Sequence, residues 1–380
     1  ADDGSGKGQE LWTSDGTGEG TTMIKEIIVG DTSPQFYDLT AVQDTLFFRA
    51  RDGNTVGKHG QEIWKSDGTP LGTVMVKDIN PGTSSSSPEN IVEMNGNAYF
   101  IANDGTNGNQ VYVSEGTTSG TNAVHPIKVI SDLNTNDLVV MNNLLFFVAD
   151  DFDTHRFQLW KSDGTSEGTE LVRDTNPSGF DNPKELTVVG DTLFFQATNG
   201  STNGVELWKT DGTFEGTEMV KDINVGSGSS TPKFLTAVND TLFFKANDGS
   251  NGEELWISDG TEIGTVLVKD IAVGGATPGL ANFAAFDNRL YFGVTIDATN
   301  GWELWESDGT PEGTVMVRDI FPGSSGSQPD NLGVVGNTLF FEARDGNQNE
   351  ELWAVSKATT EECLYYIIKT QNGGTVVPCL

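Results

Sequence analysis

The chain has 380 residues, and its 36% hydrophobic content with 21 Phe and 8 Trp is sufficient to fill a core, which argues against wholesale disorder. The 46 Gly, with only 6 Met and 3 His, favour strands joined by tight turns over a helix-rich architecture. The chain contains 22 Lys and Arg but 55 Asp and Glu, which gives a formal charge of −33. This charge would repel nucleic acids and anionic lipids, so neither is expected as a partner.

No run of apolar residues is long enough for a membrane span of about 18 residues, so no membrane insertion is predicted. No signal peptide is recognisable at the N-terminus. Ala1 followed by a polar stretch is compatible with a mature or excised chain.

One phrase recurs eight times and defines the organisation of the chain. It consists of Glu or Gln, an aliphatic residue and an aromatic residue, and it begins at Glu10, Glu62, Gln110, Gln158, Glu206, Glu254, Glu303 and Glu351. Successive aromatic residues lie 52, 48, 48, 48, 48, 49 and 48 positions apart. Most copies continue with Ser-Asp-Gly-Thr and then Gly-Thr. Such a regular period indicates a repeat architecture.

The first copy begins in the middle of the pattern, with strands predicted at residues 10–12 and 22–27. Each later repeat predicts four strands, shown most cleanly by residues 234–238, 241–246, 254–257 and 266–271. Two-residue turn signals separate the first strand from the second, and they are Asn95-Gly96, Asn142-Asn143, Gly190-Asp191, Asn239-Asp240, Asp287-Asn288 and Gly336-Asn337. These residue types tolerate the positive φ of tight hairpins, so antiparallel neighbours are expected.

Four antiparallel strands in about 48 residues match one blade of a β-propeller. Seven first strands and seven second strands predict an all-β propeller of seven four-stranded blades, with eight blades as the alternative. We expect the propeller to cover residues 1–353 and to be closed by N- and C-terminal strands. Residues 351–353 form an eighth copy of the third strand of the repeat, and residues 364–367 lie where a fourth strand belongs. Either terminus can therefore complete the last blade.

The two cysteines, Cys363 and Cys379, lie in the C-terminal tail, residues 354–380. They flank two apolar runs with Gln371–Gly374 between them, which predicts a hairpin closed by a disulfide. An extracellular or cell-surface location follows if the bridge forms.

With phrases such as Glu206-Leu207-Trp208 followed by Asp211-Gly212-Thr213, the sequence resembles the bacterial ELWxxDGT-repeat family over residues 1–353. The resemblance implies a secreted or surface-attached bacterial propeller, often a piece of a larger adhesin-like protein, and it implies no known reaction. The repeat around Tyr112 departs most from the family pattern, with Tyr for Trp and Glu115 for Asp.

The recurring tryptophans are expected to pack each blade on its neighbour, since a strand aromatic at a fixed register is usually core. They are Trp12, Trp64, Trp160, Trp208, Trp256, Trp305 and Trp353. The Asp of each Ser-Asp-Gly-Thr phrase is interpreted as turn-stabilising. Lys or Arg before Asp in the fourth strand is interpreted as a charge that discourages pairing between sheet edges. His59, His125 and His155 occupy three repeats without metal-site spacing.

The loops between second and third strands are rich in Asp, Asn and Gly, which suits Ca²⁺ ligation as well as ordinary turns. If a calcium site exists, its expected ligands are Asp104, Asp151, Asp248 and Asp345. No other cofactor is expected.

These features favour a non-enzymatic extracellular binding or adhesion module whose acidic loop face, with or without Ca²⁺, binds a surface protein or glycan. A structural subunit of a surface filament or layer, built from copies of itself, is an alternative. A polysaccharide-acting propeller hydrolase or lyase is a third hypothesis, for which the sequence offers no unmatched cluster of acid, base and nucleophile.

Overall fold

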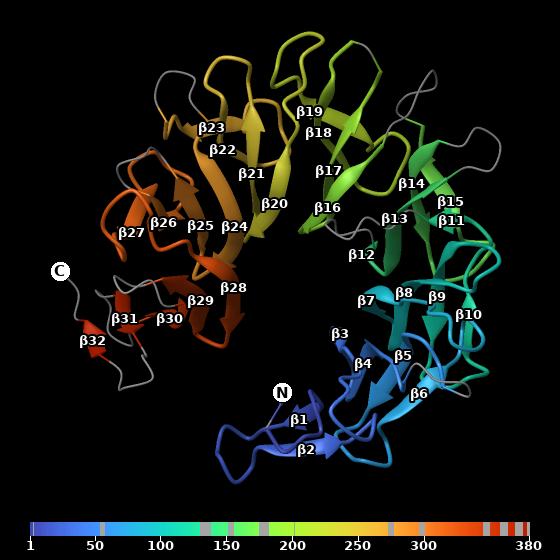
Figure 1. The fold of residues 1–380 in the computed structure, drawn as a ribbon. Helices are drawn as coiled ribbons and strands as arrows, with labels where there is room; N and C mark the ends of the chain where they lie inside the picture. Colours follow the sequence, from blue (N-terminus) through green and yellow to red (C-terminus); the bar gives the residue numbers. More distant parts are fainter. Residues whose placement is uncertain are drawn as a thin grey trace. The chain divides into compact units, whose positions relative to one another are not determined.

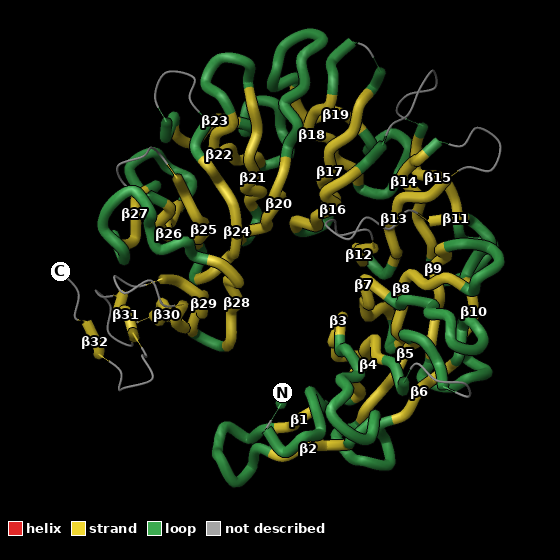
Figure 2. The backbone as a smooth tube through the Cα atoms, in the orientation of Figure 1, coloured by secondary structure: helices red, strands yellow, loops and turns green. Residues whose placement is uncertain are grey.

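The computed structural model describes residues 1–2, 4–53, 58–129, 138–150, 156–174, 182–200, 202–272, 277–295, 301–344, 350–357, 364–368 and 375–377. These residues form strands, turns and loops without helix, which confirms the all-β class (Figure 2). Accordingly, this part of the chain contains no helix with the length and apolar character needed to cross a membrane. The chain divides into two compact units, Ala1–Leu186 and Thr187–Leu380.

The first unit contains a two-stranded sheet, two four-stranded sheets and a five-stranded sheet. Their strands are β1 (Leu11–Thr13) and β2 (Thr22–Lys25); β3 (Tyr37–Val42), β4 (Thr45–Ala50), β5 (Glu62–Ser66) and β6 (Val74–Lys77); β7 (Glu89–Met94), β8 (Asn97–Asn103), β9 (Asn109–Ser114) and β10 (Thr121–Ala123); β11 (Lys128–Val129), β12 (Leu138–Met141), β13 (Leu144–Asp150), β14 (Phe157–Ser162) and β15 (Glu170–Arg173). Figure 1 shows these strands side by side within each sheet.

The second unit contains three four-stranded sheets and a five-stranded one, and the boundary between the units falls within its first strand. Its strands are β16 (Lys184–Val189), β17 (Thr192–Thr198), β18 (Val205–Thr210) and β19 (Glu218–Lys221); β20 (Lys233–Val238), β21 (Thr241–Asn247), β22 (Glu253–Ser258) and β23 (Val266–Lys269); β24 (Gly279–Phe286), β25 (Arg289–Thr295), β26 (Trp302–Ser307) and β27 (Val315–Arg318); β28 (Asp330–Val335), β29 (Thr338–Arg344), β30 (Glu350–Lys357), β31 (Leu364–Ile368) and β32 (Thr375–Val377).

The predicted turn chemistry joins the first two strands of the sheets. Asn239 adopts a φ of 53°, and the residues that flank the turn, Val238 and Thr241, pair across the hairpin. Asn95 and Gly96 have φ values of 53° and 81°. A positive φ at these positions matches the twist of a tight hairpin, so the antiparallel pairing of first and second strands follows directly from the sequence.

Neighbouring sheets within each unit pack face to face through apolar side chains. In the second unit, Trp256 of β22 shares a buried cluster with Phe194 and Leu207 of the preceding sheet. The second strand of a sheet is buried on both faces, as the pattern of β17 shows. Such strands are continuous apolar runs because neither face meets water. This stacking of consecutive four-stranded sheets is the packing expected between propeller blades.

The two ends of the chain contribute strands in different ways. Within the described part of the chain, β1 and β2 form a sheet of their own, whereas β28 to β32 follow one another in a single sheet. The expected boundary between residues 353 and 354 therefore falls inside β30. Cys363 and Cys379 lie outside the described residues, so the disulfide stays a prediction.

Candidate functional site

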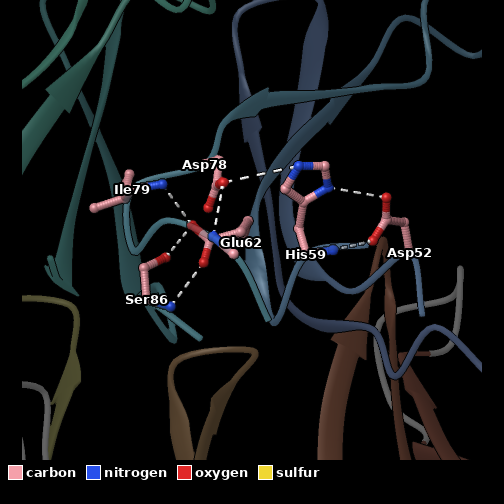
Figure 3. Close-up of polar contacts among 7 residues, drawn as sticks. Asp52, His59, Glu62, Asp78, Ile79 and Ser86 are labelled. Atoms are coloured by element: carbon pink, nitrogen blue, oxygen red, sulfur yellow. Dashed lines mark hydrogen bonds and ion pairs between the residues drawn. The ribbon is translucent and has the colours of Figure 1, made fainter. Parts of the chain in front are cut away.

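The side chains of Asp52, His59, Glu62, Asp78 and Ser86 gather at one end of the sheet of β3 to β6, and we call them the His59 cluster (Figure 3). Asp52 and His59 belong to the connection between β4 and β5. Glu62 is the first residue of β5. Asp78 and Ser86 belong to the connection between β6 and β7.

Gly60 allows the two connections to meet. A Cβ atom at this position would lie 2.3 Å from the carbonyl oxygen of Ser84, which is far closer than real Cβ contacts. Only glycine permits so close a backbone approach. The same approach recurs at Gly204, where a Cβ would lie 2.0 Å from the carbonyl oxygen of Gly228. A glycine two residues before the recurring Glu is therefore part of the repeat's architecture.

His59 contacts a carboxylate with each of its ring nitrogens. Nδ1 lies 3.0 Å from Oδ2 of Asp52, and Nε2 lies 3.7 Å from Oδ2 of Asp78. The backbone N–H of His59 also donates to Oδ1 of Asp52 at 2.7 Å. A ring with a proton on both nitrogens is a cation and can pair with both carboxylates at once. The imidazole thus links the β4–β5 connection to Asp78 across the sheet end.

Glu62 is fully buried, and its carboxylate receives three hydrogen bonds. Oε2 accepts from the N–H of Ile79 at 2.8 Å and from the hydroxyl of Ser86 at 2.5 Å. Oε1 accepts from the N–H of Ser86 at 2.8 Å. These bonds satisfy the buried carboxylate and hold the β6–β7 connection against β5, as buried polar groups require.

The pKa of Glu62 is raised to about 7, chiefly because burial penalises the charged form. The negative charge of Asp78 raises the pKa further, while the hydrogen bonds from Ser86 and Ile79 lower it. Glu62 therefore exchanges its proton near neutral pH. It does so beside a histidine that has two carboxylate partners, an arrangement with acid–base capacity that the sequence alone did not reveal.

Comparison with the other repeats separates the common part of the cluster from the unusual part. The buried glutamates Glu206 and Glu303 make the same three kinds of bond to the following connection, the former through Ile223 and Ser230. Glu62 and Ser86 are therefore repeat architecture. The position of His59, three residues before the glutamate, is occupied by Asn203 in the later repeat.

Asn203 donates from Nδ2 to Oδ2 of Asp222 at 2.7 Å, which is the counterpart of the contact between His59 and Asp78. In another repeat, Asn251 donates from Nδ2 to Oδ2 of Asp248 at 2.7 Å, which is the counterpart of the contact with Asp52. His59 combines both contacts in one side chain. Aligning the repeats around their glutamates would have singled out this substitution.

The expected calcium ligands that are described use their oxygens within their own loops. Oδ1 of Asp104 accepts from the N–H groups of Thr106 and Asn107, and its Oδ2 accepts from Nδ2 of Asn107. Asp248 makes the same three bonds. Asp151 and Asp345 lie outside the described residues. Among the residues described, no group of three or more His, Cys, Asp or Glu is placed to hold a metal. Calcium binding stays a prediction.

Most of the recurring tryptophans lie between sheets rather than in a common site. Trp64, Trp208 and Trp256 are each 6% exposed, and Trp305 and Trp353 are also buried. Trp12 and Trp160 are partly buried. The indole Nε1 of Trp12 donates to the carbonyl of Ala1, and that of Trp353 donates to the carbonyl of Ala343. Trp64, Trp160, Trp256, Trp305 and Trp353 pack in clusters with apolar side chains of a neighbouring sheet.

Solved structures with this fold are found among peptidases. A prolyl endopeptidase chain matches with a TM-score of 0.53 and 14% identity over 90% of this chain and 52% of its own length. Prolyl oligopeptidase B from Galerina marginata matches with a TM-score of 0.51 and 11% identity over 90% of this chain and 54% of its own. This chain thus spans about half the length of these relatives. At such identities the likeness shows the fold alone.

Comparison with family models gave no match. A comparison with curated proteins likewise gave none.

These comparisons correct the expected function. The expectation of a non-enzymatic adhesion or surface-assembly module is wrong, because the solved chains of this fold described above are peptide-hydrolysing enzymes. Neither a surface filament subunit nor a polysaccharide hydrolase or lyase has a counterpart in those two matches. The physical reason for the error is that the repeat motif builds turns and inter-sheet packing, as at Trp256 and Glu206, so its presence carries no information about adhesion.

Proposed function

We propose that this chain is the β-propeller part of a peptide hydrolase and that it receives peptide substrates for the catalytic part. The observation that supports the proposal is that the fold of this chain corresponds to about half of two peptidase chains. The structure of the first is described in terms of inter-domain dynamics in catalysis and specificity, and the second was solved bound to a 35mer hydrolysis and macrocyclization substrate.

Charge supports a peptide ligand. With a formal charge of −33, the chain attracts peptides that carry ammonium or guanidinium groups and raises their local concentration. The His59 cluster places a histidine and the carboxylate of Asp52 in the connection between second and third strands of a sheet, beside the carboxylate of Asp78 in the connection to the next sheet. Such connections carry binding residues on a rigid scaffold, so we assign peptide contact to this type of connection.

Two finer features belong to the same proposal. The four-stranded sheets are blades of one seven-bladed ring, which is supported by the repeat count and by the stacking of sheets within each unit. The chain is a member of the ELWxxDGT-repeat family, which is supported by the recurring phrase and its period. A location outside the cell stays a prediction.

Peptide binding by the purified chain tests this function. A panel of short flexible peptides, with and without proline and with neutral or basic side chains, is titrated while fluorescence anisotropy is recorded, and neutral oligosaccharides serve as controls. We expect saturable binding of peptides in the micromolar to millimolar range, strongest for basic ones and weakened by salt. A folded protein that binds none of the peptides, or that binds oligosaccharides instead, contradicts the proposal.

A further inference from the structure

The repeat that departs most from the common phrase contains a cavity of about 470 Å³ within the first unit, and we call it the Tyr112 pocket. Its lining includes Asp104, Gln110, Tyr112, His125 and Ser166. The volume lies within the range of about 300–1,000 Å³ that is usual for small-molecule sites. The other lining residues come from the same connections, so the pocket is made by one sheet and the turn of the next.

Two substitutions in the recurring phrase change the interior of this repeat. Tyr112 occupies the position of the recurring tryptophan and stacks on Phe100 with ring centroids 6.0 Å apart, as Trp64 stacks on Phe48 at 6.5 Å. The smaller phenol ring fills less of the space between the connections than an indole would. Tyr112 is itself only 5% exposed, so its ring forms a wall of the pocket rather than a surface group.

Gln110 replaces the recurring glutamate and reverses its role. The glutamates accept hydrogen bonds from the following connection, as Glu62 does from Ile79, whereas Nε2 of Gln110 donates to the carbonyl of His125 at 3.5 Å. This hydrogen bond is long. His125 then borders the pocket, and its Nδ1 is buried without a hydrogen-bond partner among the described residues.

The electrostatic character of the pocket is negative. Asp104 keeps its charge, because hydrogen bonds led by the N–H of Asn107 lower its pKa. The pKa of Tyr112 is raised to about 12, first by burial and then by the charges of Asp104 and Glu62. Neither lysine nor arginine is among the residues that line the cavity. A cationic ligand is therefore favoured over an anionic one.

We propose that the Tyr112 pocket binds the ammonium group of a peptide, with Asp104 as its counter-charge and the ring of Tyr112 as an apolar wall. The inference rests on the proposed function and specifies where that peptide is held. His125, Ser166 and Gln110 also line the pocket, and their side chains carry groups of the kind that accept hydrogen bonds from the N–H groups of such a ligand. An aromatic face beside the charge adds cation–π attraction.

Calorimetric titration of the full chain with three probes tests the proposal and separates the two sources of an ammonium group. Phenylalaninamide carries an α-ammonium group, Nα-acetyl-lysinamide carries an ε-ammonium group, and N-acetylphenylalaninamide carries none. We expect saturable binding of at least one ammonium probe and no binding of the third. If phenylalaninamide binds more tightly, the pocket takes a peptide N-terminus; if Nα-acetyl-lysinamide does, it takes a lysine side chain.

Two variants locate the binding. Tyr112→Trp restores the common residue of the repeat, which the fold accommodates at Trp64 and Trp208, and fills the cavity. Asp104→Asn removes the charge and keeps Oδ1 as acceptor for the loop N–H groups. Each variant is expected to bind the ammonium probe with an affinity at least about tenfold lower than that of the parent. Trp208→Tyr, the same exchange in reverse at a repeat that keeps Glu206, is the matched control and is expected to leave the affinity unchanged.

Melting temperatures establish that each variant is folded, and Asp104→Asn decides the matter if Tyr112→Trp does not fold. Equal affinity in the parent and both folded variants overturns the inference, as does equal binding of the acetylated probe or binding of no probe. If peptides bind the parent and Tyr112→Trp with equal affinity, the proposed function is retained and the assignment of binding to the Tyr112 pocket is refuted. If the ammonium probes bind the pocket but the peptides do not bind the chain, the proposed function is refuted and the ammonium site in the pocket is retained.

Discussion

The ammonium group of Lys221 donates a hydrogen bond of 2.7 Å to the carbonyl oxygen of Thr265, which lies in the turn between β22 and β23 of the next sheet. The relationship recurs along both units, and the distances are 2.7 Å for Lys25 and Thr73, 2.5 Å for Lys77 and Thr121, and 2.8 Å for Lys269 and Thr314. Each lysine is the last residue of a fourth strand, and each threonine ends the Gly-Thr phrase of the following repeat. The motif therefore joins sheets as well as turning the chain.

This contact changes the interpretation of the fourth-strand lysines. The sequence favoured a role in discouraging pairing between sheet edges, and the structure adds a specific acceptor in the neighbouring sheet. Lys269→Met, which keeps most of the aliphatic length and removes the donor, is expected to lower the free energy of unfolding by about 1–2 kcal/mol, because a charged hydrogen bond is lost. Urea unfolding measures the change.

Lys233→Met is the control for this experiment, since Lys233 is exposed on β20. It is expected to change the urea midpoint little. A Lys269→Met variant as stable as the parent would show that the contact with Thr314 contributes nothing measurable.

The turn between third and fourth strands depends on one carboxylate. Oδ1 of Asp259 accepts from the N–H of Thr261 at 2.8 Å and from its hydroxyl at 2.7 Å. Asp259→Ala is expected to cost about 1 kcal/mol of stability, because the turn loses both acceptor contacts, and Asp259→Asn is expected to cost less because one acceptor is kept. Thermal unfolding ranks the two variants, and an equal effect of both would refute the assigned role of Oδ1.

Gly264 tests the same turn from the other side. A Cβ at this position would lie 2.1 Å from Oδ1 of Asp259, so Gly264→Ala has to displace the carboxylate from its contacts. We expect Gly264→Ala to destabilise the protein about as much as Asp259→Ala, and we expect the double variant to cost less than the sum of the single ones. A double-mutant cycle of melting temperatures measures the coupling, and strict additivity would contradict the contact.

Local chemistry made the hairpins and the inter-sheet aromatic residues predictable. Asn239 and Gly96 predict turns through their tolerance of positive φ, and the recurrence of Trp256 at a fixed register predicts a residue buried between sheets. The contact between Lys221 and Thr265 joins residues 44 positions apart, which is nearly one repeat. A single repeat, read alone, cannot reveal a contact to its successor.

The candidate site was missed for a related reason. His59 was judged by metal-site spacing along the chain, whereas its partners Asp52 and Asp78 become neighbours only when Gly60 brings two connections together. The glycine two positions before the glutamate, and the asparagine that stands for His59 in a later repeat, were visible in the sequence. The role of these residues depends on the close backbone approach at Ser84, which cannot be predicted from the sequence of a single repeat.

The raised pKa of Glu62 predicts how stability depends on pH. Because the folded-state pKa is about 7 against an ordinary value of 4.5, the folded protein binds the proton more tightly than the unfolded chain does. Its linked stabilisation is complete below about pH 4.5 and is lost as pH rises through about 7. The melting temperature is therefore expected to fall between pH 5 and pH 8 at constant ionic strength, by an amount worth no more than about 3 kcal/mol for this group.

Glu62→Gln separates this effect from the general relief of negative charge at low pH. The substitution is compatible with the repeat, because Gln110 and Gln158 occupy the same position. We expect the melting temperature of Glu62→Gln to vary less with pH than that of the parent. Glu262→Gln, at an exposed position, serves as the charge-matched control and should keep the parent's dependence. Identical slopes for the parent and both variants would refute the assignment to Glu62.

His59 allows a test of whether one side chain joins the two connections. His59→Asn introduces the residue that Asn203 represents in a later repeat, and its single amide reaches one of the two carboxylates, as Asn203 reaches Asp222. His59→Ala removes both contacts. Since the ring nitrogens lie 3.0 Å from Asp52 and 3.7 Å from Asp78, the contact with Asp52 is the stronger one. We expect His59→Ala to lower the free energy of unfolding by about 1–2 kcal/mol and His59→Asn to lower it roughly half as much.

Urea unfolding at pH 6 gives the two values, and a double-mutant cycle of His59→Ala with Asp78→Asn measures the weaker contact. A coupling energy of zero in that cycle would confine the role of His59 to the β4–β5 connection and leave Asp78 outside the cluster.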